Sequence, residues 1–186
     1  LGSSNGVDDN DPMWTSGGIN GDALIFDGKD DYIDCGNNPS LDITDEISME
    51  AWIFPRSWGP YGNYGFGRIT NKGSLGMYLH DTASPGGPDH SLFVSMKIGN
   101  QFEFLASAKD TIKLNTWQHV AFSYNGSDLN IYIDGVQCPF VGGQPSGKLD
   151  SEIDSNLQIG NSENLDRAFN GTIDEVGVYS RVLTYS

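Results

Sequence analysis

The chain has 186 residues, and its 10 Lys and Arg against 25 Asp and Glu give a formal net charge of −15. A surface this acidic repels phosphate backbones and anionic lipid headgroups, so the composition argues against nucleic-acid binding and against attachment to membranes through a basic patch. No apolar run approaches the roughly 20 residues that a membrane-spanning helix needs. Hydrophobic residues make up 37% of the chain, which is enough for a core, so we expect one folded domain.

Short runs with a period of two dominate the sequence, and they are rich in β-branched and aromatic residues, as half-buried strands are. In chain order, strands are expected at residues 22–26, 30–35, 47–54, 68–72, 75–80, 91–98, 102–106, 117–124, 129–133, 156–160 and 171–179. Single helical turns are expected at 39–41 and 182–183. Many short strands without a long helical stripe predict a sandwich or a barrel.

Turn residues separate these runs. Asn125-Gly126-Ser127-Asp128 predicts a hairpin, and Asp134-Gly135 predicts the next tight turn. The sequences Asn125-Gly126-Ser127 and Asn170-Gly171-Thr172 also match the glycosylation pattern, although a turn is the preferred interpretation. Whether Cys35 and Cys138 pair stays open at this point.

Seven motifs occur in a fixed order along the chain. They are Gly21–Gly28 (GDALIFDG), Asp31–Asp34 (DYID), Ser48–Ile53 (SMEAWI), Asn115–Ala121 (NTWQHVA), Ile131–Gly135 (IYIDG), Leu157–Gly160 (LQIG) and Phe169–Thr184 (FNGTIDEVGVYSRVLT). Together they resemble the laminin G-like jelly-roll domains of the concanavalin A-like lectin/glucanase superfamily. The resemblance implies an all-β fold, a two-sheet antiparallel jelly-roll sandwich over residues 20–186, preceded by an irregular N-terminal arm at 1–19.

The resemblance also implies a structural calcium ion between the early Phe-Asp-Gly segment and the last strand. Carried over to this sequence, its ligands would be Asp27 and Asp174, together with Gly21 and Asp22. Two carboxylates that meet repel each other unless a cation or protons intervene, and calcium prefers oxygen ligands. The alternative is that these aspartates are solvated turn residues that bond to their own backbone.

A glycine-laced aromatic loop at 55–67 is the candidate ligand site. Its rings are Trp58, Tyr61, Tyr64 and Phe66, and Arg56 and Arg68 would supply polar contacts to a sugar. The alternative is that the loop folds over the sandwich and buries its own rings. In contrast, Trp52 and Trp117 lie in patterned strands, so packing is their expected role.

Catalysis is not expected. Glycosidases of this superfamily use carboxylates on one strand in the pattern Glu-x-Asp-x-x-Glu. Here Glu152-Ile153-Asp154 begins the pattern, but Leu157 occupies its last place.

The sequence therefore predicts a non-catalytic, calcium-stabilised, lectin-like module that binds a polysaccharide or glycan and belongs to a larger extracellular or cell-surface protein. One alternative is a protein–protein adhesion or spacer domain whose partner is a cell-surface or matrix protein. A glycoside hydrolase or polysaccharide lyase of the same fold is the third.

Overall fold

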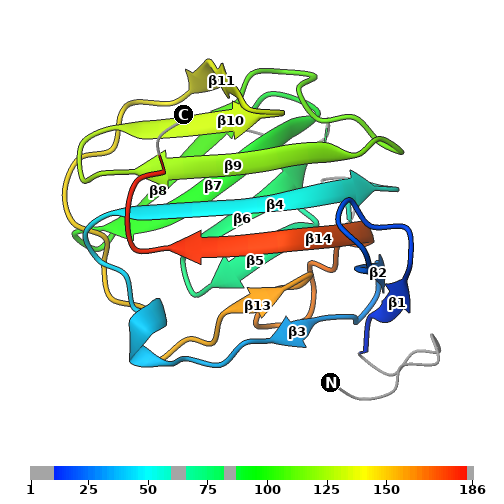
Figure 1. Ribbon diagram of the computed structural model, residues 1–186. Coiled ribbons are helices and arrows are strands. Elements are labelled where there is room, and N and C mark those ends of the chain that lie inside the picture. The colour runs from blue at the N-terminus through cyan, green and yellow to red at the C-terminus, as the bar shows by residue number, and fades with distance from the viewer. Residues whose placement is uncertain (1–10, 60–65, 82–86, 184–186) are drawn as a thin grey trace.

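The computed structural model describes residues 11–59, 66–81 and 87–183. These residues form two antiparallel sheets of seven strands each, packed face to face, with sheet A in front of sheet B in Figure 1. The strand order is β1-β2-β14-β4-β9-β10-β11 in sheet A and β12-β8-β7-β6-β5-β13-β3 in sheet B. The expected jelly-roll sandwich is confirmed. Within the described ranges, no helix has the length and apolar character that crossing a membrane requires.

The strand bounds follow the turns of the sequence. Sheet A comprises β1 (Met13–Thr15), β2 (Ala23–Asp27), β4 (Ile47–Pro55), β9 (Gln118–Tyr124), β10 (Leu129–Ile133), β11 (Val136–Cys138) and β14 (Asn170–Tyr179). Sheet B comprises β3 (Ile33–Asp34), β5 (Arg68–Lys72), β6 (Leu75–His80), β7 (Ser91–Ile98), β8 (Gln101–Ser107), β12 (Phe140–Val141) and β13 (Gln158–Ile159). The 3-10 turn η1 (Pro39–Leu41) precedes β4 and is capped by the Asn38 side chain.

Most elements lie where the alternation predicts them, and β5, β6 and β7 have the expected bounds. The helical turn at 39–41 is confirmed, whereas residues 182 and 183 are not helical. The short strands β1, β11 and β12 were not predicted. Since β1 pairs with β2, the segment 1–19 is not irregular throughout, and its residues 1–10 lie outside the described part.

Alternate side chains of both sheets point inward and form the core. Phe26, Ile53 and Phe122 of sheet A meet Met77 and Val94 of sheet B, and each is 0–1% exposed. Burying a side chain of this size contributes about 1.5–3 kcal/mol. The core therefore fixes which residues of each strand face outward, and these outward residues form the two candidate binding faces.

The predicted turns are present. Asn125 connects β9 to β10, and its Oδ1 accepts hydrogen bonds from the backbone N–H groups of Ser127 and Asp128 at 2.9 and 2.7 Å. Asp134 and Gly135 connect β10 to β11 with φ of +52° and +75°, the left-handed pair that a type I′ hairpin turn requires. The two cysteines do not form a disulfide.

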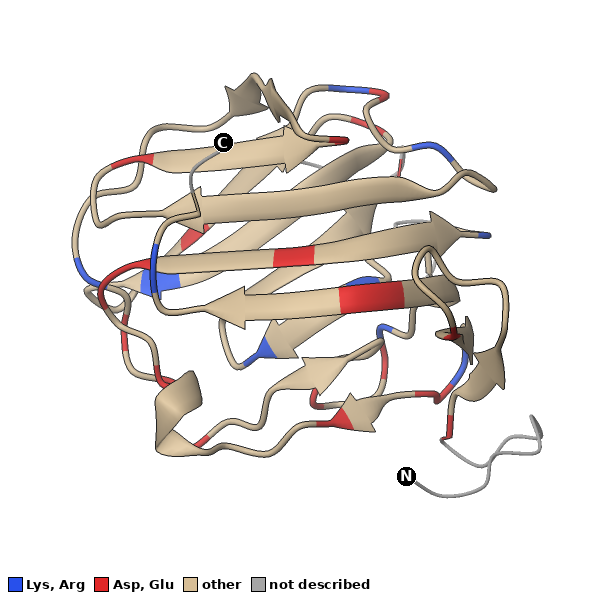
Figure 2. Ribbon diagram, viewed as in Figure 1, with Lys and Arg blue, Asp and Glu red and all other residues tan. Residues whose placement is uncertain are grey.

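Charge is divided between the sheets. The strands of sheet A contain no Lys or Arg, but they carry Asp27, Glu50, Asp174 and Glu175. Figure 2 shows the acidic positions of β4 and β14 in the middle of this layer. The strand cations Arg68, Lys72 and Lys97 all belong to sheet B.

Candidate functional site

The expected pair Asp27 and Asp174 does lie on neighbouring strands, but the two residues do not meet. In the β2–β14 ladder Asp27 is opposite Asn170, whereas Leu24 is opposite Ile173. Asp174 is therefore displaced from Asp27 by four positions along the ladder, about 13 Å at the rise of a strand. The structure therefore does not bring these two predicted calcium ligands together.

Asp174 instead binds the loop between β1 and β2 directly. Its Oδ2 accepts hydrogen bonds from the backbone N–H groups of Ile19 and Asn20 at 2.8 and 3.3 Å. Its Oδ1 accepts one from the N–H of Glu175 at 2.9 Å. Gly18 makes room for this contact, because a Cβ there would lie 2.7 Å from Asp174 Oδ2. The loop after β1 and the strand β14 are thus joined by hydrogen bonds to one carboxylate.

The other two expected calcium ligands lie at this loop. Gly21 has φ of +85° and its carbonyl accepts a hydrogen bond from the N–H of Gly18 at 3.1 Å. Asp22 is exposed and lines a cavity of about 230 Å³ between the sheets. Neither residue is part of the carboxylate group described next.

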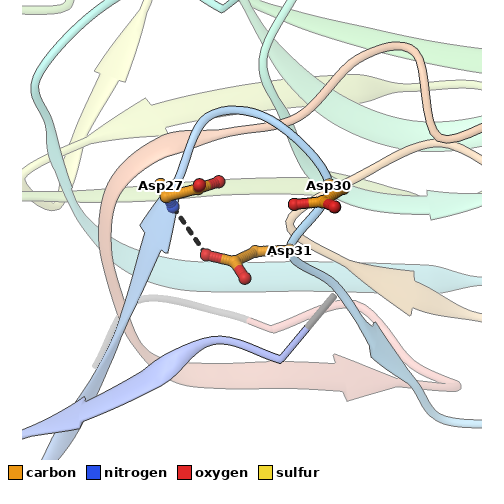
Figure 3. Close-up of side chains that lie close together, drawn as sticks. All are labelled: Asp27, Asp30 and Asp31. Atoms are coloured by element: carbon orange, nitrogen blue, oxygen red, sulfur yellow. Dashed lines mark hydrogen bonds between the residues drawn. The ribbon is translucent and has the colours of Figure 1, made fainter. Parts of the chain in front are cut away.

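A group of three carboxylates does occur at the end of β2. Asp27, Asp30 and Asp31 each offer an oxygen, and these oxygens lie within 4.8 Å of one another. Figure 3 shows the three side chains around one turn of chain, with Asp31 Oδ2 accepting a hydrogen bond from the Asp27 N–H at 2.7 Å. Asp31 is 7% exposed, and Asp30 Oδ1 is buried without a hydrogen-bond partner.

The described part of the aromatic loop packs against the domain. The Trp58 ring is half-buried, contacts the core and stacks on His90 with centroids 4.8 Å apart. Phe66 is also half-buried and lies edge-on to Tyr78 at 5.8 Å. Tyr61 and Tyr64 lie outside the described residues. The rings of Trp58 and Phe66 therefore do not form an exposed platform.

The two arginines expected to contact the ligand differ in their surroundings. Arg56 is exposed, whereas the Arg68 guanidinium lies 3.9 Å above the Tyr78 ring. Burial lowers the pKa of Arg68 from its usual value, and the nearby Tyr78 opposes this effect. Its Nε and Nη1 are buried without hydrogen-bond partners. Arg68 thus has two buried donors without partners on the outward side of sheet B.

An aromatic pair that the sequence analysis missed stands on the same face. Phe102 and Phe104 of β8 are 59% and 55% exposed, and their rings are stacked with centroids 5.9 Å apart and an interplanar angle of 10°. The Nζ of Lys97 lies 5.7 Å from the centre of the Phe102 ring. The alternation along residues 101–107 could have predicted this pair. Leu105 of the same strand is buried in the core, so Phe102 and Phe104 must lie on the other side of the strand.

A polar row continues from this pair across sheet B. The cross-strand partners are, in order, Phe104, Ser95, Gly76, Asn71 and Gln158. Ser95 and Gly76 are small residues, so the middle of the row carries little side-chain volume. Gln158 Oε1 is buried and has no hydrogen-bond partner, although buried polar atoms nearly always have one.

Asn161 adds another unused donor beside this face. Its Oδ1 accepts the N–H of Arg167 at 3.0 Å, whereas its Nδ2 is buried without a partner. We name the outward side chains Phe102, Phe104, Ser95, Asn71, Gln158 and Arg68, together with Asn161, the sheet B face. The exposed rings can contact the apolar side of a sugar, whereas the unpaired amide and guanidinium atoms lie buried beside them.

The tryptophans assigned to packing lie on the opposite surface. Trp52 and Trp117 are half-buried and point outward from sheet A, where Trp52 contacts His119 and Trp117 contacts Phe54. Their centroids lie 5.3 Å and 5.7 Å from these partners. Neither tryptophan belongs to the core: Trp52 alternates with the inward Ala51 and Ile53, and Trp117 directly precedes β9.

Comparison with solved structures finds the same fold in several carbohydrate-binding proteins. Domain 4 of AbnA, a GH43 extracellular arabinanase from Geobacillus stearothermophilus solved with arabinotriose, is 20% identical with a TM-score of 0.66, over 93% of this chain and 77% of that chain. The CBM40 of the Ruminococcus gnavus IT-sialidase, bound to α2,3 sialyllactose, is 12% identical with a TM-score of 0.62, over 87% of this chain and 91% of that one.

A toxin domain shares the fold as well. The receptor-binding domain of botulinum neurotoxin mosaic serotype C/D is 17% identical with a TM-score of 0.61, over 94% of this chain and 42% of that one. At these identities the likeness establishes the fold and not the ligand. No curated protein sequence matches the chain.

A family model gives the assignment. The model of the concanavalin A-like lectin/glucanases superfamily matches residues 27–186, which include every strand of the sandwich except β1 and most of β2. With the two-sheet architecture described above, the chain belongs to the concanavalin A-like lectin/glucanases superfamily.

Proposed function

We propose that the chain is a non-catalytic carbohydrate-binding module and that the sheet B face binds the glycan. The observation that carries the proposal is the exposed, stacked pair Phe102 and Phe104 at the end of a row of polar side chains. Large exposed apolar rings on a soluble domain mark a binding surface. The carbohydrate-binding domains of the same fold support this assignment.

The charge of the sheet B face supports a binding role rather than a hydrolytic one. Glycosidases place two carboxylates on either side of the scissile bond. The strands β5, β6, β7 and β8 contain a single acidic residue, Glu103, which alternates with the outward Phe102 and Phe104. These four strands therefore present exposed rings but no pair of carboxylates that could cleave a sugar.

Binding to a glycan panel that includes arabinotriose and α2,3 sialyllactose tests the proposal. We expect at least one oligosaccharide to bind, and Phe102→Ala with Phe104→Ala to weaken binding tenfold or more. Val136→Ala is the matched control, because Val136 is 67% exposed on β11 of the other sheet. Binding that survives the double substitution would place the site elsewhere, and Trp58→Ala and Tyr61→Ala then test the loop at 55–67.

We further propose that a structural calcium ion binds Asp27, Asp30 and Asp31. The orphaned oxygen of Asp30 and the close approach of three carboxylates fit a cation, since calcium takes about 6–8 oxygen ligands and completes its shell with carbonyls and water. An ion there would stabilise the turn between β2 and β3. It would also remove the repulsion among the three charges.

An extracellular or cell-surface location follows from the proposed ligand, because polysaccharides and glycan chains are found there. The related domains support this location, one of them being part of an extracellular arabinanase. As part of a larger protein, the module would gain avidity by tethering.

Adhesion to a cell-surface or matrix protein is the second candidate function. The packed rings of Trp58 and Phe66 favour it, because they remove the sugar platform that the loop at 55–67 was expected to provide. Two results together would favour this candidate. No glycan in the panel would bind, and the Phe102→Ala, Phe104→Ala variant would lose binding to cells.

A further inference from the structure

The outer face of sheet A carries a second group of aromatic and acidic side chains, on the opposite side of the sandwich from the sheet B face. Glu50 and Trp52 point outward from β4, because Met49, Ala51 and Ile53 between and beside them are buried in the core. Across the sheet, His119 of β9 is the partner of Trp52.

The carboxylate of Glu50 is held in one orientation. Tyr179 Oη donates a hydrogen bond to Glu50 Oε1 at 2.7 Å, and His119 Nε2 lies 3.1 Å from Glu50 Oε2. The Trp52 ring packs beside His119 with centroids 5.3 Å apart. The hydrogen bond to Glu50 is the main cause of the raised pKa of Tyr179, so this phenol stays protonated as a donor.

An irregularity in β14 opens a cavity beside this group. The pairing of β14 with β4 shifts between Asp174 and Gly177, and Glu175 there adopts φ of +48°. On the other side, Asp174 holds the backbone of Ile19 and Asn20.

These segments enclose a cavity of about 330 Å³ on the outer face of sheet A. The lining side chains that matter here are Glu50, Trp52, His119, Glu175 and Tyr179, and Ile19 and Asn20 form part of the rim. This volume is at the lower end of the range of about 300–1,000 Å³ for small-molecule sites.

The wall of the cavity contains two carboxylates and no lysine or arginine, and its one histidine, His119, pairs with Glu50. Its two carboxylates belong to Glu50 and Glu175, and among the described residues Glu175 forms no ion pair. The strands of sheet A contain no basic residue, as Figure 2 shows for the layer in front. Arg181 lies 5.8 Å from the Tyr179 ring but is exposed and does not line the cavity. Anionic ligands are therefore disfavoured here.

We propose that this cavity is a second binding site for organic ammonium groups, a class that includes both quaternary ammonium groups and the end of a lysine-like chain. Trp52 and Tyr179 border the cavity, and the faces of aromatic rings attract such cations, an interaction that strengthens when water is excluded. Glu175 supplies the opposite charge, and Glu50 adds a second carboxylate that Tyr179 and His119 hold in place. The site is independent of the glycan face, because its residues lie on the other sheet.

Titration with choline and with its neutral isostere 3,3-dimethylbutan-1-ol tests the proposal, with the Trp52 indole N–H signal followed by NMR. Nα-acetyl-lysine methylamide, compared with its norleucine counterpart, tests the primary ammonium. We expect each cation to bind at least tenfold more tightly than its neutral partner. Trp52→Ala and Glu175→Gln should each weaken cation binding fivefold or more. Glu175 is exposed, so its substitution leaves the fold intact.

Glu163→Gln is the matched control, because it removes the same charge from an exposed loop outside the cavity. It should change cation binding less than twofold, and the Phe102→Ala, Phe104→Ala double variant should not change it. Equal binding of a cation and its neutral isostere overturns the proposal, as does the absence of binding. Weakening by Glu163→Gln as strong as that by Glu175→Gln would also overturn it, since it would show attraction to the net charge alone.

Discussion

The carboxylate of Asp174 accepts a hydrogen bond from the backbone N–H of Ile19 at 2.8 Å, which connects positions 155 apart in the sequence. With the bonds from Asn20 and Glu175, it joins the loop after β1 to the last strand. The sequence analysis expected an ion in this role. The structure instead shows direct hydrogen bonds between a side chain and the backbone. These bonds also hold Ile19 and Asn20, which line the cavity on the outer face of sheet A.

Replacing Asp174 should destabilise the domain substantially. Hydrogen bonds to charged groups contribute about 1.5–3 kcal/mol each and are not additive, so Asp174→Ala should lower the free energy of unfolding by about 3 kcal/mol. Urea denaturation measures this change. Asp22→Ala is the control, because Asp22 is exposed in the same loop, and its effect should stay within about 0.5 kcal/mol. Equal effects of the two substitutions would contradict the role given to Asp174.

Calcium should raise the melting temperature through the three carboxylates at the end of β2. A ligand that binds only the folded state stabilises it by mass action, by about 2.7 kcal/mol at 100 times its dissociation constant. Thermal unfolding after EDTA treatment, and again after calcium is restored, measures the shift. Asp30→Asn should abolish the shift, whereas Glu163→Gln should leave it unchanged. If calcium raised the melting temperature of Asp30→Asn by the same amount, the ion would have to bind at another site.

His80 should make the domain less stable in mild acid. The His80 side chain is 1% exposed, and burial lowers its pKa below the usual 6.5, although the Pro88 carbonyl opposes this effect. The unfolded chain therefore binds more protons than the folded one between the two pKa values. Stability should fall as the pH drops through 6.5 and should stop falling below the pKa of the folded state.

His80→Phe isolates this contribution, because the ring can still stack on Phe93, whose centroid lies 4.4 Å from that of His80. The variant loses the bond from Nδ1 to the Pro88 carbonyl, which contributes about 1 kcal/mol. Its free energy of unfolding should depend less on pH between 5 and 7 than that of the unmodified chain. Parallel pH profiles for the two proteins would contradict the prediction.

Lys72 should be needed for stability despite its charge. It is 2% exposed, and its ammonium donates hydrogen bonds to the carbonyls of Glu152 and Ser155 at 2.9 and 2.5 Å. Lys72→Met keeps the apolar stem but leaves both carbonyls without this donor, so we expect a loss of about 2–3 kcal/mol in denaturant unfolding. Lys148→Met removes an ion pair at the surface and should cost less than about 1 kcal/mol.

The strands could be predicted from the sequence because turn residues mark where they begin and end. The bounds of β5, β6 and β7 follow from Gly73, Gly99 and the loop at 81–90, which interrupt clear alternation. The strands β11 and β12 have three and two residues, too few for a period to be visible. The architecture could thus be predicted, whereas the edges of the sheets could not.

The site residues were harder to predict because they depend on register. The sequence correctly placed the strands of Asp27 and Asp174 side by side, but only the ladder shows the offset between them. Phe102 and Phe104 were missed, although the alternation along β8 places their rings on the side away from the core. The unused polar atoms of Arg68 and Gln158 depend on neighbours distant in the sequence, and no local pattern reports them.

The strand order has a mechanical consequence. The strands β1 and β14 both pair antiparallel with β2, so they run in the same direction, and the chain enters sheet A at one end and leaves it at the other (Figure 1). Tension applied to the two ends would act along the strands and shear their ladders. The pairing of β1, only three residues long, would yield first, while the long β14 ladder with β4 would resist.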